Sequence, residues 1–213
     1  MRPQLQRRVQ QYGWDYSSPH YEEGWKNQLW PAQERLLELV NPTYGERGLD
    51  ISCGTGLVTF PLVEAVGEKG HVTGIDLTEK MIEQAEKTAI DMGISNIVFR
   101  HMDAEELDFT QSTFAVAINS LGLMYYPDPD KAVAEMYRVL RSGGRASALV
   151  WGRRSDCGWA EIFPIVDRRV KSDVCPLFFQ LGTGNTLSQL FSSVGFQQVN
   201  TKQFSINLEY KSD

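Results

Sequence analysis

Between residues 47 and 151 the sequence alternates short apolar runs with longer amphipathic ones, and this spacing restricts the fold more than any other feature. The short runs predict strands, and the longer runs, with apolar residues three and four apart, predict helices. Such alternation favours an α/β fold of the Rossmann-like, doubly wound type, a mostly parallel sheet with helices on both faces. We predict strands at 47–52, 71–76, 96–101, 114–119 and 145–151, and helices at 57–66, 79–93 and 130–140.

The chain of 213 residues is predicted to form a single domain, since one core of this length can bury most of its apolar surface. Its N-terminal segment places several aromatic residues among polar ones, which is typical of a helical lid packed onto a neighbouring core. The predicted parts are a lid over 1–40, the core over 47–151, an insertion over the ligand side of the sheet at 152–184, and a C-terminal helix and strand over 185–213.

Two local signals concern the segments outside the core. Pro31 is suited to the first turn of a helix, so we expect a helix to begin there and to end at Asn41. Residues 196–201, extended by 204–210, predict a sixth strand. No strand signal follows before the end of the sequence, so a C-terminal strand is expected to be missing.

The composition excludes several classes of protein. Hydrophobic residues make up 42% and charged residues 23%, as in ordinary globular chains, and no apolar run approaches the roughly 20 residues needed to span a membrane. The net charge of −6 argues against general nucleic-acid binding, which needs a basic surface. The three cysteines lack metal-ligand spacing and form no disulfide pattern. We therefore expect a cytoplasmic protein with no metal site.

A glycine-rich loop, residues 52–56, follows the first predicted strand and opens a helix. Ligands of open parallel sheets bind outside the carboxyl ends of the strands. Glycines at Gly54 and Gly56 would let the backbone approach a ligand closely. Asp76 and Asp103 follow the second and third strands at the same edge, where Asp76 is suited to a ribose diol; a helix cap or turn is the alternative for each.

The loop discriminates between two nucleotide-type ligands. A dinucleotide loop would place a third glycine at Thr59, and a Walker loop is absent. Asp50, just before the loop, would repel a pyrophosphate, whereas it suits a cationic ligand such as a sulfonium with an α-amino group. The sign of this charge favours S-adenosylmethionine over NAD.

Four motifs follow one another along the chain: LDISCGTG, GIDLTEKMIEQA, RHMDAEELDF and FAVAINSLGLMYYPDPDKAVAEMYRVLRSGGR. In this order they resemble class I S-adenosylmethionine-dependent methyltransferases, most nearly the small-molecule enzymes of ubiquinone and menaquinone biosynthesis. The resemblance covers roughly residues 47–151. Ser52 departs from the family's usual glycine. That family closes its sheet with a sixth strand and an antiparallel seventh strand, so a borrowed strand or a partner, such as the second copy in a homodimer, is a hypothesis for the open edge.

The resemblance implies S-adenosylmethionine as the cofactor and S-adenosylhomocysteine as its product. It implies a methionyl site, a ribose site and an adenine site, each built from the carboxyl end of a strand. The residues implied to contact the cofactor are Asp50, Ser52, Cys53, Gly54, Gly56, Asp76, Leu77, Met81, Asp103, Ala104 and Asn119.

Methyl transfer from a sulfonium needs little beyond alignment of donor and acceptor, so a catalytic motif is not expected. His20 is the candidate general base if the acceptor must lose a proton. We predict methyl transfer to a small apolar or aromatic acceptor. The alternatives are a cofactor-binding protein without catalysis and, disfavoured by the loop, an NAD(P)-dependent oxidoreductase. The candidate acceptor-binding residues are aromatic: Trp14, Tyr21, Trp25, Tyr125 and Tyr126.

Overall fold

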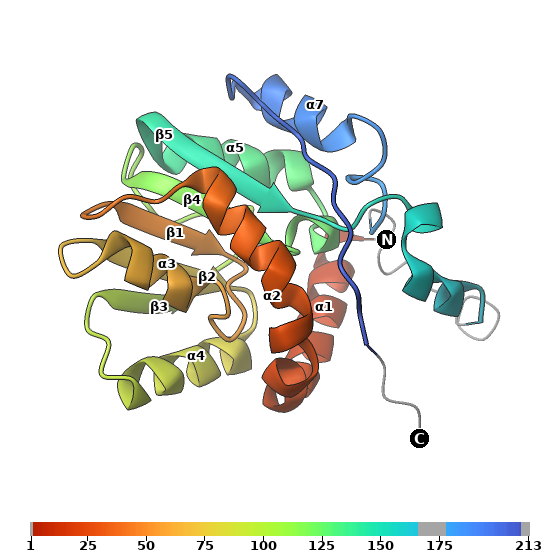
Figure 1. Cartoon of the computed structure of the whole chain (residues 1–213), viewed down its shortest axis with the longest axis horizontal. Coiled ribbons are helices and arrows are strands. Elements are labelled where there is room, and N and C mark those ends of the chain that lie inside the picture. Colours follow the sequence, from red (N-terminus) through yellow and green to blue (C-terminus); the bar gives the residue numbers. More distant parts are fainter. Residues whose placement is uncertain (1, 166–177, 210–213) are drawn as a thin grey trace.

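One five-stranded parallel sheet organises the chain in the computed structural model, which describes residues 2–165 and 178–209 (Figure 1). The strand order is β3-β2-β1-β4-β5, so the chain reverses direction across the sheet between β1 and β4. All five predicted strands are confirmed, although β5 begins five residues earlier than expected. Their bounds are β1 Arg47–Ile51, β2 His71–Asp76, β3 Ile97–His101, β4 Phe114–Ser120 and β5 Leu140–Leu149.

Helices cover both faces of the sheet, which confirms the doubly wound fold. Figure 1 shows α2 (Tyr21–Val40) and α3 (Thr59–Val66) on the near face, where Leu36 and Leu62 share one apolar cluster with Val116 of β4. On the other face α5 (Pro129–Val139) and α7 (Thr186–Val194) share a second cluster with Leu49 and Ile51. Asp50, between these two residues in β1, instead accepts a hydrogen bond from Thr59 of α3, so alternate residues of β1 face opposite layers.

The remaining elements complete the layers and loops. The helix α4 (Glu79–Asp91) buries Met81, Ile82, Ala85 and Ala89, the face expected from their spacing. The helix α1 (Pro3–Ser17) leads into α2 through a short turn. The 3₁₀ turns are η1 Ser18–His20, η2 Leu123–Tyr125, η3 Arg154–Asp156 and η4 Gly158–Ile162.

The expected start of a helix at Pro31 is wrong, because α2 begins ten residues earlier and contains this proline. A proline inside a helix removes one backbone hydrogen bond. The loss is offset by a continuous buried face, in which Leu29, Ala32, Leu36 and Val40 all turn toward the core. Tertiary packing thus overrides the local signal at this position.

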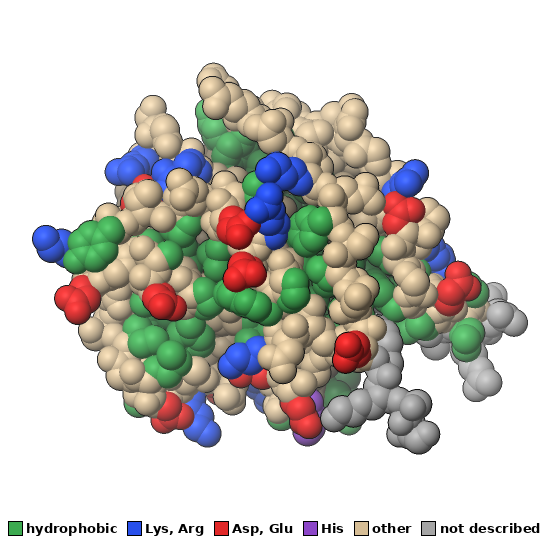
Figure 2. All heavy atoms as spheres, viewed as in Figure 1, with side chains coloured by type: hydrophobic (Ala, Val, Ile, Leu, Met, Phe, Trp, Pro, Cys, Tyr) green, Lys and Arg blue, Asp and Glu red, His purple; other side chains and the backbone are tan. Residues whose placement is uncertain are grey.

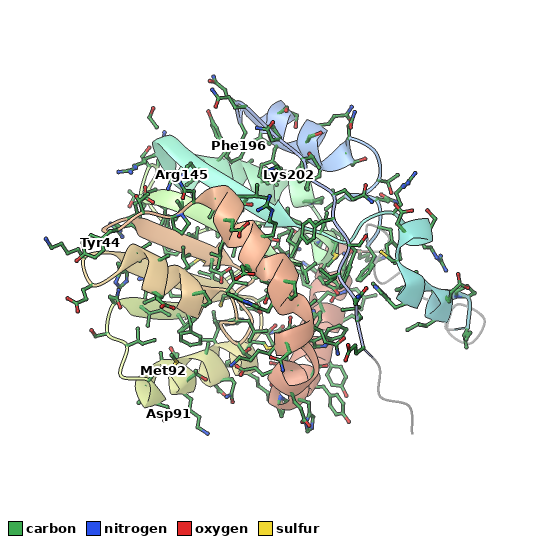
Figure 3. The ribbon with its side chains drawn as sticks, in the orientation of Figure 1. Tyr44, Asp91, Met92, Arg145, Phe196 and Lys202 are labelled. Carbon is green, nitrogen blue, oxygen red and sulfur yellow. The ribbon has the colours of Figure 1, made fainter. Side chains whose placement is uncertain are left out.

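The expected sixth strand is also wrong within the described part, since residues 196–209 form no strand. Figure 1 and Figure 3, where Phe196 and Lys202 are labelled, show this segment descending from α7 past the end of β5. Gln198 has a φ of +54°, which interrupts an extended run, and Glu209 N donates to Gln28 Oε1 of α2 at 3.1 Å. Residues 166–177 of the predicted insertion, and residue 210 of the predicted strand, lie outside the described residues.

The surface visible in Figure 2 carries acidic and basic side chains close to one another, so positive charge is not concentrated on that face. Within residues 2–165 and 178–209, no helix has the length and apolar character required to cross a lipid bilayer. The same residues contain no group of three or more His, Cys, Asp or Glu side chains arranged to hold a metal ion.

Candidate active site

A cavity of about 250 Å³ opens at the carboxyl ends of the strands, next to the reversal between β1 and β4. All five candidate acceptor-binding aromatics line it. Seven of the candidate cofactor-binding residues line it too; six lie at or just after the carboxyl ends of β1, β2 and β3, and Met81 lies in α4. These seven are Ser52, Gly54, Asp76, Leu77, Met81, Asp103 and Ala104.

The other sequence candidates lie elsewhere. Asp50, Cys53, Gly56 and Asn119 do not line the cavity and belong to the structure behind its wall. His20 is exposed at the junction of η1 and α2 and does not line the cavity either, so the structure gives no geometric support for its role as a base. Among the described residues that line the cavity there is no histidine.

The polar half of the cavity is formed by the glycine-rich loop and the end of β2. Gly54 N donates to Asp76 Oδ2, and Thr78 N donates to Asp76 Oδ1, both at 2.9 Å. Burial raises the pKa of the Asp76 carboxyl, and these backbone donors oppose that rise. Each carboxylate oxygen can accept a further hydrogen bond, so Asp76 can both fix the loop and bind a ligand.

The two loop glycines serve different purposes. Gly54 has a φ of +55°, and a Cβ there would point at the Tyr21 ring, with its nearest carbon 3.9 Å away. Gly56 has a φ of +94°, and a Cβ there would lie only 2.6 Å from the Phe60 ring. Gly54 therefore keeps the cavity wall thin, whereas Gly56 permits α3 to pack against the loop.

Asp50 points away from the cavity toward α3. Its Oδ2 accepts a hydrogen bond from Thr59 Oγ1 at 2.7 Å, and its Oδ1 has no partner among the described residues. Burial raises the pKa of Asp50 to about 7, because the charged form is desolvated there. The carboxyl of Asp50, which favoured S-adenosylmethionine over NAD in the sequence analysis, thus lies behind the glycine-rich loop. It makes no direct contact with the cavity.

Ser52 links the glycine-rich loop to the segment after β4. Its φ of +59° is the left-handed conformation that glycine adopts more easily. Its Oγ lies 2.5 Å from the Tyr126 hydroxyl, which also accepts a hydrogen bond from Asn119 Nδ2 at 2.7 Å. Asn119 is itself fixed, because its Oδ1 accepts from the backbone of Gly122 and Leu123. Burial raises the pKa of Tyr126, so this hydroxyl stays protonated.

The N-terminal helix α1 closes one side of the cavity through residues that the motifs did not single out. Arg7 Nε donates to Asp103 Oδ2 at 2.7 Å, and the same guanidinium pairs with Glu105. Gln6 Nε2 donates to the Tyr125 carbonyl at 3.0 Å. Helical spacing could have revealed this wall, because Arg7 and Trp14 fall seven residues apart on one face and both line the cavity.

The aromatic half of the cavity combines rings from distant parts of the chain. Trp14 of α1 meets Tyr125 edge to face at 5.4 Å between centroids, and Tyr125 meets Phe178 at 5.5 Å. Trp159 packs between Phe178 and Trp151, at 5.4 and 5.3 Å. Edge-to-face packing of this kind holds rings rigidly around an apolar space. The described parts of the predicted insertion thus contribute Trp159 and Phe178 to the cavity.

Comparison with known proteins agrees with this geometry. The model of the ubiE/COQ5 methyltransferase family matches residues 25–162, well over half of the chain. The chain belongs to the ubiE/COQ5 methyltransferase family. Its cofactor is accordingly S-adenosylmethionine, and its sheet is that of the class I methyltransferases. The resemblance inferred from the four motifs is confirmed.

Individual proteins of known name are similar to parts of this chain. Aklanonic acid methyltransferase from Streptomyces sp. (strain C5) is 39% identical over 131 residues, which are 62% of this chain and 60% of that protein. Demethylmenaquinone methyltransferase from Listeria monocytogenes serotype 4a (strain HCC23) is 27% identical over 172 residues, 81% of this chain and 69% of that protein. A solved structure of a SAM-dependent methyltransferase, possible histamine N-methyltransferase, from Thermotoga maritima has a TM-score of 0.67 at 21% identity, covering 88% of this chain and 81% of its own.

Proposed function

We propose that this chain transfers a methyl group from S-adenosylmethionine to a small apolar or aromatic acceptor. One observation carries the proposal: a single cavity combines a polar half at the glycine-rich loop with an aromatic half built from rings of distant segments. The polar half is suited to the cofactor and the aromatic half to the acceptor. Membership of the ubiE/COQ5 methyltransferase family supports the reaction class.

The residues present fit the cofactor. Asp76 retains free lone pairs at the cavity wall, as a carboxylate that accepts from both ribose hydroxyls requires. Gly54 and Ser52 would lie along the methionyl part, and Leu77 and Met81 would flank the adenine ring. Asp103 and Ala104 would meet the adenine edge. Asp50, Cys53, Gly56 and Asn119 would support this site from behind.

Catalysis would rest on position and on exclusion of water. S-adenosylmethionine, when bound, supplies a methyl group on a sulfonium centre. Its leaving group is good, because the sulfonium becomes the neutral thioether of S-adenosylhomocysteine. Holding an acceptor in line with that methyl group can supply up to roughly 7–11 kcal/mol of rate enhancement. The rings of Trp14, Tyr125 and Trp159 would orient a flat or apolar acceptor and keep water away from it.

The names of two relatives support the proposal of a small organic acceptor. They act on aklanonic acid and demethylmenaquinone. An acceptor of comparable apolar character fits the aromatic half of the cavity. The division into lid, core, insertion and C-terminal part belongs to this proposal, with the lid and the insertion enclosing the acceptor. A cytoplasmic location, a homodimer and the lack of a nucleic-acid partner remain predictions from the sequence.

Calorimetric titration with S-adenosylhomocysteine, S-adenosylmethionine and NAD tests the cofactor. We expect both sulfur nucleosides to bind and NAD to bind at least 100-fold more weakly; binding of NAD alone would refute the proposal. The second step is incubation with methyl-labelled S-adenosylmethionine and a metabolite extract. Label in a small apolar product is expected. Cofactor binding without any transfer, also with purified aromatic acceptors, would favour the alternative of a cofactor-binding protein that has no catalysis of its own.

A further inference from the structure

The helix α1 has its amphipathic character reversed relative to an ordinary surface helix. Its inner face is largely polar, with Gln6 buried and Arg7 and Gln10 lining the cavity. Its outer face carries apolar and aromatic side chains turned toward solvent. This outer stripe consists of Leu5, Val9, Tyr12 and Tyr16, which are 50%, 37%, 76% and 78% exposed.

The four side chains of the outer stripe form one continuous surface. They follow at intervals of four, three and four residues, which places them on one side of a helix, one above the other. Surface helices normally turn such a stripe toward the core. A contiguous exposed apolar stripe on a stable helix marks a surface for interaction.

Positive charge borders the outer stripe. At 100° for each residue, Arg8 falls beside the outer stripe, and Arg2 is the N-cap residue at the Leu5 end of the stripe; both side chains are exposed. Residues 2–14 contain no acid, although the whole chain carries a net charge of −6. The first acid of α1 is Asp15, whose carboxylate accepts a hydrogen bond from Lys80 N at the start of α4. The face that α1 presents is therefore apolar at its centre, with one exposed cation at its margin and another at its N-terminal end.

We propose that the outer face of α1 docks onto an anionic lipid surface. A helix that lies in a membrane interface combines an apolar stripe with basic margins, and tyrosine rings suit the boundary between headgroups and acyl chains. The four side chains of the outer stripe are few beside the roughly 20–30 residues that each partner contributes to a stable protein interface, which favours a lipid surface over a second protein. The inner face of the same helix walls the cavity, so docking would bring the cavity to the place where an apolar acceptor dissolves. This last step rests on the proposed function.

Co-sedimentation of the full chain with phospholipid vesicles tests the proposal. Vesicles of phosphatidylcholine alone are compared with vesicles in which about one third of the lipid is phosphatidylglycerol. We expect binding to the anionic vesicles that decreases with salt and with loss of the anionic lipid. The double variant Tyr12→Ser/Tyr16→Ser should bind at least about tenfold more weakly. The variant Arg2→Gln/Arg8→Gln should lose roughly 30-fold on anionic vesicles and little on neutral ones.

A matched control removes apolar side chains of similar exposure elsewhere. Ile90 and Met92, at the end of α4, are 78% and 59% exposed, and Figure 3 shows Met92 beside Asp91 at the rim of the molecule. Ile90→Ser/Met92→Ser should leave vesicle binding unchanged. No binding to either vesicle at low salt, or equal binding by the tyrosine variant, would overturn the proposal. So would a dimer in sedimentation velocity that dissociates in the tyrosine variant, since a second copy would then cover α1.

Titration of the same proteins with S-adenosylhomocysteine separates this proposal from the proposed function. Normal cofactor binding without vesicle binding would overturn only the proposed docking of α1 onto lipid. Vesicle binding without cofactor binding would overturn only the proposed methyltransferase function.

Discussion

The two halves of the cavity are held in place in different ways. In the polar half, the carboxylate of Asp76 is fixed by the backbone amides of Gly54 and Thr78, all within 30 residues of one another in the sequence. In the aromatic half, Trp14, Tyr125, Trp159 and Phe178 come from four separate segments and meet through their rings. One half depends on backbone geometry and the other on side-chain packing.

This difference has a consequence for how the two halves can vary. A backbone-fixed site keeps its shape as long as its strands and glycines remain, so it suits a ligand shared by a whole family. A side-chain cluster changes shape with each substitution, so it suits an acceptor that differs between relatives. If the two halves are separable in this way, changes in one should leave the other intact.

The largest expected effect comes from the aromatic half. Trp159→Ala removes a ring packed between Trp151 and Phe178, and should lower the free energy of unfolding by about 3 kcal/mol. The affinity for S-adenosylhomocysteine should stay within about twofold of wild type. Urea denaturation and calorimetry measure the two quantities. Trp30→Ala is the control, since that ring is 36% exposed and does not line the cavity. A tenfold loss of cofactor affinity in Trp159→Ala would show that the halves are coupled.

The next effect concerns the polar half. Asp76→Ala leaves the amides of Gly54 and Thr78 without their acceptor and removes the proposed ribose contact. We expect the affinity for S-adenosylhomocysteine to fall about 30-fold, or roughly 2 kcal/mol, as measured by calorimetry. Asp91→Ala, at the exposed end of α4, should change nothing. If Asp76→Ala bound S-adenosylhomocysteine as tightly as wild type, the proposed contact between Asp76 and the ribose would be wrong.

The smallest effect lies where the halves meet, at Ser52. Both Ser52→Ala and Ser52→Gly lose the hydrogen bond to Tyr126, but only glycine relieves the positive φ. The glycine variant should therefore be more stable than the alanine variant by about 1 kcal/mol in urea denaturation. Tyr126→Phe removes the same bond and also the one from Asn119, so adding Ser52→Ala to Tyr126→Phe should cost little more. Equal stability of the two Ser52 variants would mean that the loop relaxes and stores no strain.

Much of the fold could be predicted because buried parallel strands read as short apolar runs, separated by glycines and amphipathic helices. The prediction failed where packing overruled local signals. Pro31 lies inside α2 because the buried face of that helix continues past it. Residues 196–209 run beside the sheet without joining it, and nothing in their local pattern excluded a strand. Four predicted cofactor residues lie behind the cavity wall. Asp50 does so because side chains of one strand alternate between layers, and its carboxyl faces α3.

The sequence by itself determined the parallel sheet, the glycine-rich loop and the position of Asp76 at the same sheet edge, because these depend on neighbours along the chain and on the fixed geometry of strands. Only the tertiary structure decided that Arg7 would pair with Asp103, that Ser52 would join Tyr126, and that Trp159 and Phe178 would complete the cavity. Such contacts join segments far apart in the chain. Their partners are selected by packing in three dimensions, which leaves no periodic signal in the sequence.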